Sequence, residues 1–101
     1  MDPDTTDLSI ADVVVSTAGR DAGSLFYVIG ADAQYLMLVN GKDRTTEKPK
    51  KKKRKHARKV LRSETRVAAK LLSGDKVLNS ELRKDLAYLR KELTGSDLGG
   101  F

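Results

Sequence analysis

Three short apolar runs follow one another in the first half of the chain. They occupy residues 13–15, 25–29 and 35–39, and each is rich in β-branched or aromatic residues. Runs of this length, separated by turn residues, are typical of β-strands. Gly19 and Gly23 lie between the first two runs, and Asn40-Gly41 follows the third, where it predicts a type I′ hairpin turn. The pattern predicts a small antiparallel β-barrel.

The C-terminal third carries two apolar stripes at helical spacing. The first stripe comprises Val67, Ala68, Leu71 and Leu72, and the second comprises Leu82, Leu86, Leu89 and Leu93. Ser63 is the predicted N-cap of the first helix, and Gly74 is its predicted end. The second helix is predicted to begin after Asn79 or Ser80 and to end at Gly95.

The second and third apolar runs are hydrophobic at consecutive positions, so both faces of these strands need cover. We expect the two helices to provide it, with the leucine stripes in the core. In the alternative, the helices stand apart and contact another protein through Leu82, Leu86, Leu89 and Leu93. The predicted fold is mainly β with a helical appendage. Its parts are a flexible tail at 1–7, a barrel at 8–61, the appendage at 62–94 and a second flexible tail at 95–101.

Positive charge is concentrated in one segment. The net charge is +6, from 20 lysines and arginines against 14 acidic residues. Residues 1–47 carry a net charge of −5, residues 48–62 carry +10 and residues 63–101 carry +1. The basic segment, residues 48–59, supplies the sequence-independent attraction to phosphate from which nucleic-acid binding starts. Blocks of like charge also occur in solvated linkers and targeting signals.

The chain shows none of the common catalytic or metal-binding motifs. It has no cysteine, which excludes disulfides, cysteine-ligated zinc and a cysteine nucleophile. His56 is the single histidine and has no partner close in sequence for a metal or proton-transfer role. No phosphate-binding loop motif or nucleophile elbow is present. We therefore expect no enzyme activity, no cofactor, no metal and no small-molecule substrate.

Membrane insertion and export are not indicated either. No apolar run approaches the roughly 18 residues that a membrane helix needs. The first nine residues contain three aspartates and no basic residue, whereas a secretory signal begins with positive charge. The expected location is the cytoplasm, with no membrane partner.

The loop and strand residues of the first half form a recognisable arrangement. Residues 12–23 read DVVVSTAGRDAG and are followed by an apolar strand, NGKDR at 40–44 and KPKKK at 48–52. This arrangement resembles the bacterial KOW-domain RNA-binding proteins, a family similar to KOW-containing large-subunit ribosomal proteins of archaea and eukaryotes. The resemblance covers residues 8–60 and includes Lys55-His56. It implies an SH3-like β-barrel of KOW type that binds ribosomal RNA or the ribosome.

Three positions depart from the family pattern. Ala11 stands where the family has a glycine before the first strand, and Ala57 stands where it has a leucine. Ala22 replaces a lysine or arginine that is common in KOW loops, which removes one expected phosphate contact from the loop.

The KOW loop of the resemblance lies between the first two predicted strands. Gly19 and Gly23 permit close approach of the backbone to a ribose-phosphate chain, although a bare turn requirement explains them equally well. Arg20 can present a bidentate guanidinium to phosphate, and Asp21 is expected to accept backbone N–H groups within the turn. The candidate RNA-binding residues are Arg20, Lys42, Arg44, Lys48, Lys50, Lys51, Lys52, Lys53, Arg54, Lys55, His56, Arg58 and Lys59.

Aromatic residues are candidates for stacking on unpaired bases. They are Phe26, Tyr27 and Tyr35, and we expect core packing for two of the three. His56 is expected to be a barrel-strand residue or a stacking and phosphate contact.

Two functional interpretations remain open. In the first, the chain is a non-catalytic RNA-binding module, and the basic segment closes the barrel as an ordered strand at about residues 53–60. In the second, residues 49–55 are a nuclear import signal on a small nuclear or protein-interaction adaptor. Continuity of the KOW-like pattern into the basic segment favours the first.

Overall fold

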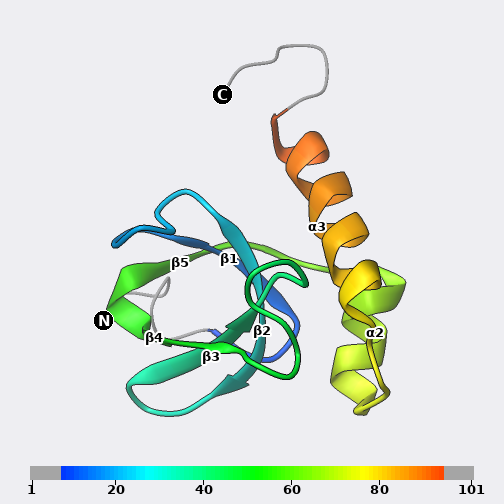
Figure 1. The fold of residues 1–101 in the computed structure, drawn as a ribbon, viewed down its shortest axis with the longest axis horizontal. Coiled ribbons are helices and arrows are strands. Elements are labelled where there is room, and N and C mark those ends of the chain that lie inside the picture. Colours follow the sequence, from blue (N-terminus) through cyan, green and yellow to red (C-terminus); the bar gives the residue numbers. More distant parts are fainter. Residues whose placement is uncertain (1–7, 95–101) are drawn as a thin grey trace.

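The computed structural model describes residues 8–94, so the two predicted tails and the predicted helix end at Gly95 lie outside the described residues. Five strands, one short 3-10 helix and two α-helices make up the fold (Figure 1). They are β1 (Asp12–Ser16), β2 (Leu25–Ala31), β3 (Tyr35–Val39), β4 (Lys50–Lys53), η1 (Arg54–His56), β5 (Ala57–Arg62), α2 (Arg66–Ser73) and α3 (Asn79–Thr94). The predicted mainly β fold with two C-terminal helices is confirmed.

The five strands form one antiparallel sheet in the order β4-β3-β2-β1-β5. β4 and β5 are its edges, so the sheet described by residues 8–94 is open rather than closed. η1 joins the two edge strands through three residues and brings their ends together. Register shifts next to Val13 in β1 and next to Val28 in β2 bend the sheet further, because bulges increase the local twist.

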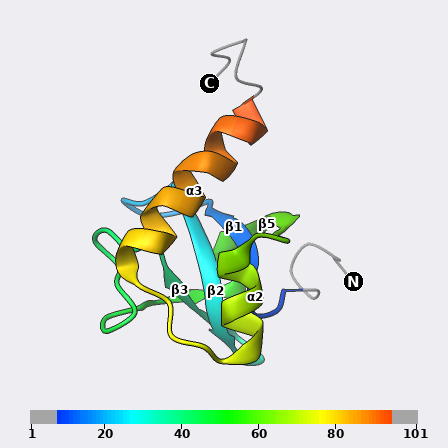
Figure 2. The same cartoon turned by 90° about the vertical axis from the view of Figure 1, so that its right-hand side faces the viewer.

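Apolar side chains cover both faces of the sheet, as the consecutive hydrophobic positions predict. The inner face, turned away from the helices, carries Leu8, Val14, Phe26, Val28, Leu36, Leu38 and Ala57. The outer face carries Val13, Tyr27 and Val39, which pack with Val67, Ala68, Val77, Leu82, Leu86 and Leu89 of the helical region. Figure 2 shows α2 and α3 lying across this one face. The helices therefore complete a core that the sheet alone leaves exposed.

The leucine stripe of α3 is core. Leu82, Leu86 and Leu89 are at most 7% exposed, so contact with another protein through these three residues is wrong. Leu93 is 39% exposed, and Leu72 of the first predicted stripe is 60% exposed.

The hydroxyl of Tyr27 links the sheet to both helices. It lies 2.7 Å from the Ser63 hydroxyl and donates a hydrogen bond to the Asp85 carboxylate. The Ser63 hydroxyl is therefore bound to Tyr27, and the prediction that Ser63 caps α2 is wrong. The N-cap is Thr65, whose hydroxyl accepts a hydrogen bond from the Ala68 N–H at 3.3 Å. Burial, together with the bond to Asp85, raises the pKa of Tyr27 to about 12. The hydroxyl therefore stays protonated and remains a donor.

The predicted two-residue hairpin at Asn40-Gly41 is wrong, because residues 40–49 connect β3 to β4. Gly41 has a φ of 77°, whereas Asn40 has no positive φ. A Cβ on Gly41 would lie 2.2 Å from the Asn79 carbonyl oxygen and 2.9 Å from the Leu82 Cβ. The start of α3 thus rests directly on this glycine, and tertiary packing overrides the local turn preference.

Gly74, with a φ of 77°, ends α2 as predicted and offers a matched comparison for Gly41. A Cβ at Gly74 would meet nothing within 4 Å. Gly74→Ala should therefore cost only the left-handed strain, about 1 kcal/mol in the free energy of unfolding. Gly41→Ala adds a clash with α3 and should cost about 2 kcal/mol more. Urea unfolding of both variants checks this, and equal losses would contradict the packing of α3 on the loop.

Candidate nucleic-acid interface

The four lysines of β4 alternate between the two faces of the sheet. Lys50 and Lys52 stand opposite two buried leucines of β3, on the inner face. Lys51 and Lys53 stand opposite Met37 and Tyr35, on the outer face. Lys52 is only 8% exposed, whereas Lys51 and Lys53 are exposed. The basic segment therefore consists of two chemically different sets of cations.

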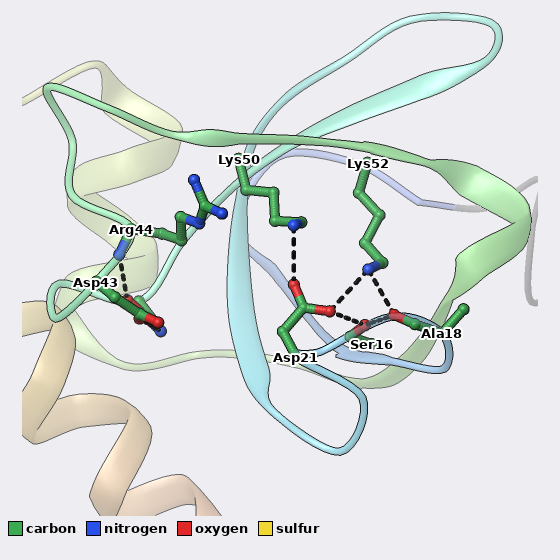
Figure 3. A network of polar contacts seen from close by, with 8 residues as sticks. Ser16, Ala18, Asp21, Asp43, Arg44, Lys50 and Lys52 are labelled. Carbon is green, nitrogen blue, oxygen red and sulfur yellow. Dashed lines mark hydrogen bonds and ion pairs between the residues drawn. The ribbon is translucent and has the colours of Figure 1, made fainter.

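Asp21 binds both lysines of the inward pair. The Lys52 ammonium lies 2.8 Å from Asp21 Oδ1 and 2.8 Å from the Ala18 carbonyl oxygen (Figure 3). The Ser16 hydroxyl donates to Asp21 Oδ1 at 2.7 Å, and the Lys50 ammonium lies 3.4 Å from Asp21 Oδ2. Asp21 was expected to bind backbone N–H groups of its own turn. It instead binds β4, which is distant in sequence.

The electrostatics of this cluster keep Asp21 ionised. Burial raises the pKa of the carboxyl, but hydrogen bonds from Lys52 and Ser16 and the charges of Lys52 and Lys50 outweigh it and lower the pKa to about 2. Lys52 is consequently held inside by a carboxylate and a carbonyl. Lys52 is therefore a poor candidate for RNA contact, contrary to the prediction, because its ammonium is buried and already paired.

Lys59 is a third inward-facing lysine. It pairs with Val14 across the sheet, and its ammonium lies 3.5 Å from Asp12 Oδ2. Asp12 is 1% exposed and also accepts a hydrogen bond from the Ser9 N–H at 2.9 Å. Lys59 thus compensates a buried carboxylate at the start of β1. It is a poor candidate for RNA contact, contrary to the prediction.

The outward set consists of exposed cations on one continuous stretch of β4, η1 and β5. We name it the outer basic surface, and its members are Lys51, Lys53, Lys55 and Arg58. The predicted strand at about 53–60 is confirmed in part: residues 57–60 lie in β5, whereas Lys53 ends β4 and η1 occupies residues 54–56. Lys48, which precedes β4, is also exposed.

η1 is fixed to two other loops. The Arg54 N–H donates to the Gln34 carbonyl oxygen at 2.9 Å, and Arg54 Nε donates to the Asp32 carbonyl oxygen at 2.6 Å. The Thr17 N–H donates to the His56 carbonyl oxygen at 2.9 Å. His56 ends η1 and does not belong to a strand, so that part of its prediction is wrong. These hydrogen bonds fix η1, and with it the part of the outer basic surface that includes Lys55.

The β1–β2 loop positions Arg20 at the protein surface. Gly19 and Gly23 have φ values of 85° and 89°, conformations that glycine adopts without strain. Lys52 binds the loop from β4, and Arg90 of α3 donates to the Gly23 carbonyl oxygen at 2.8 Å. Arg20 itself is exposed. The loop is therefore anchored on both sides of its cationic residue.

The β3–β4 loop carries the remaining two predicted contacts. Lys42 is exposed and Arg44 is half-buried. The Asn40 side chain organises the loop, since Oδ1 accepts from both their N–H groups and Nδ2 donates to Asp43. The hydrogen bond from Asn40 lowers the pKa of Asp43, whose carboxylate lies between the two cations in sequence. This acidic neighbour weakens the positive field of the loop.

Two arginines of α3 that are not among the predicted contacts hold the loops of the interface. Arg83 Nη1 donates to the Gly41 carbonyl oxygen at 2.8 Å, and Arg90 reaches Gly23 as described. They are seven residues apart, which places them on the same face of α3. This spacing is the feature of the sequence from which a shared role of the two arginines could have been predicted. Each arginine holds one of the two loops that bear candidate contacts.

Other kinds of site find little support within residues 8–94. No group of three acidic or histidine side chains there is placed to hold a metal ion. No helix in the same part of the chain has the length and hydropathy to cross a bilayer. The sequence matches no protein-family model and no curated protein.

The Asp21 cluster predicts a pH-dependent contribution to stability. Because the folded-state pKa of Asp21 is about 2 against an ordinary 3.8, its contribution is complete above about pH 4 and is lost as the pH falls toward 2. Asp21→Asn should cost about 2 kcal/mol in the free energy of unfolding at pH 7, and this difference from wild type should shrink toward pH 2. Urea unfolding across this pH range measures it.

Asp75→Asn, at an exposed carboxylate in the α2–α3 connection, is the control and should stay within about 0.5 kcal/mol of wild type at pH 7. A constant gap between Asp21→Asn and wild type from pH 7 to pH 2 would contradict the assigned role of Asp21.

Proposed function

We propose that this chain is a non-catalytic RNA-binding module of the cytoplasm, associated with ribosomal RNA or the ribosome. The observation that carries the proposal is the sorting of the basic segment into paired and unpaired cations. Lys51, Lys53, Lys55 and Arg58 are exposed, and none forms a salt bridge within residues 8–94. Exposed cations that are not held in an internal salt bridge are suited to a polyanion.

The chemistry of the surface favours backbone contacts over base reading. Lysine is a point charge on a flexible stem, so it follows phosphates without demanding a particular base. Arg20 on the anchored β1–β2 loop adds a planar guanidinium, which can bind a phosphate through two hydrogen bonds. Recognition would then depend on the shape and charge of the RNA.

Several features of the fold support an SH3-like, partly open barrel of KOW type. The strand order and the 3-10 helix between the last two strands agree with it. Ala11 has a φ of 76°, a conformation that favours glycine, and the KOW family has a glycine at this place. The Ala18-Gly19-Arg20-Asp21 sequence lies in the loop between β1 and β2, where a KOW loop is expected.

The alternative is a nuclear or protein-interaction adaptor whose basic run serves as a localisation signal. Such a signal has to be accessible along its length. Residues 50–56 are instead folded into β4 and η1, and Lys52 is 8% exposed. These observations favour RNA binding over a targeting signal.

The test is the salt dependence of RNA affinity. Converting Lys51, Lys53 and Lys55 together to Gln should lower the slope of log affinity against log salt by about 2, since each phosphate contact on a single strand contributes about 0.7. Fluorescence anisotropy with a labelled ribosomal RNA fragment at several salt concentrations gives the slope.

The matched control converts Arg66, Lys76 and Lys84 to Gln, three exposed cations of the helical region that change the net charge equally. If the control flattens the slope as much as the first variant, the outer basic surface is not the binding site. If the wild-type protein shows no salt-dependent RNA affinity, the proposed function is wrong.

A further inference from the structure

We propose that Tyr35 is the stacking site for one unpaired base of the bound RNA, an inference that rests on the proposed function. Three aromatic residues of the sheet were candidates, and burial separates them. Phe26 and Tyr27 are at most 1% exposed and belong to the two cores. Tyr35 is half-buried, at the first position of β3 on the outer face. It is the sheet aromatic that a ligand can reach.

Two lysines of β4 flank Tyr35. The Lys51 ammonium lies 4.4 Å from the ring centroid, and Lys53 is the direct cross-strand neighbour of Tyr35. Arg54 follows in η1, held by the Asp32 carbonyl oxygen at 2.6 Å. An aromatic ring flanked by positive side chains is the arrangement by which proteins bind single-stranded nucleic acid, with bases on the ring and phosphates on the cations.

The Lys51 ammonium marks a face of the ring that an external group can occupy. Lys51 is exposed and carries its charge on a flexible four-carbon stem. Stacking of a base on a tyrosine is the stronger of the two interactions at an exposed site. The base can therefore displace the ammonium, which then moves to the adjoining phosphate without losing a partner.

The backbone beneath the ring is pre-organised. Asp32 Oδ1 accepts from the Tyr35 N–H at 2.7 Å and from the Gln34 N–H at 2.8 Å. The Gln34 carbonyl oxygen accepts from the Arg54 N–H, which ties this turn to η1. Little ordering of the chain is then required on binding. Since bases inside a duplex are already stacked on each other, the site selects loops, bulges and single strands.

The experiment compares a fluorescently labelled 12-nucleotide single-stranded RNA with the same strand in a blunt duplex, using anisotropy. Tyr35→Leu should weaken single-strand binding about tenfold, because it keeps apolar bulk but removes the ring. The salt slope should not change, since no charge is lost. Tyr35→Phe retains the ring and should bind like wild type. Tyr88→Leu, at a tyrosine 56% exposed on α3, is the control and should have no effect.

Replacing one base with 2-aminopurine adds a direct readout, because its fluorescence is quenched on stacking. Quenching with wild type and Tyr35→Phe but not with Tyr35→Leu supports the inference. If wild type binds both RNAs and Tyr35→Leu binds the single strand equally well, the stacking site is wrong while RNA binding stands. If wild type binds neither RNA, both proposals are wrong. Thermal melting of each variant excludes unfolding as the cause.

Discussion

A strand of four consecutive lysines depends on one carboxylate from another loop. β4 pairs with the apolar strand β3, so two of its ammonium groups are directed toward the inner core. Placing such groups there without an anion would be strongly unfavourable, because burial penalises an unpaired charge. Asp21 supplies the anion, and its contact with Lys52 also holds the β1–β2 loop against β4. The position of Arg20 depends on this contact, because Arg20 lies in the loop that the contact holds.

The elements that depend on local hydrophobic pattern were predictable from the sequence. β1, β2 and β3 contain the three apolar runs, and α3 begins at Asn79, one residue before the earlier of its two predicted starts. The need for a helical cover also followed, because consecutive apolar residues in a strand point to opposite faces. These features are set by side-chain periodicity, which the sequence displays directly.

The division of the basic segment was not predictable, because it depends on register and on contacts between distant residues. Lysines carry no hydrophobic signal, so nothing local indicated that 50–53 form a strand or which of them face inward. Asp21 lies 31 residues from Lys52, and its role became visible only with the sheet pairing. The type I′ hairpin turn predicted at Asn40-Gly41 was wrong for a similar reason, because the packing of the start of α3 on Gly41 involves residues distant in sequence.

The open sheet leaves two edge strands, and both are basic. An exposed edge offers unpaired N–H and C=O groups to which another chain can add a strand, and lysine is a common natural defence against such pairing. Two copies of this protein would bring like charges together at either edge. The lysines that attract phosphate therefore also oppose self-association into extended sheets, and replacing one with an apolar residue would weaken both properties together.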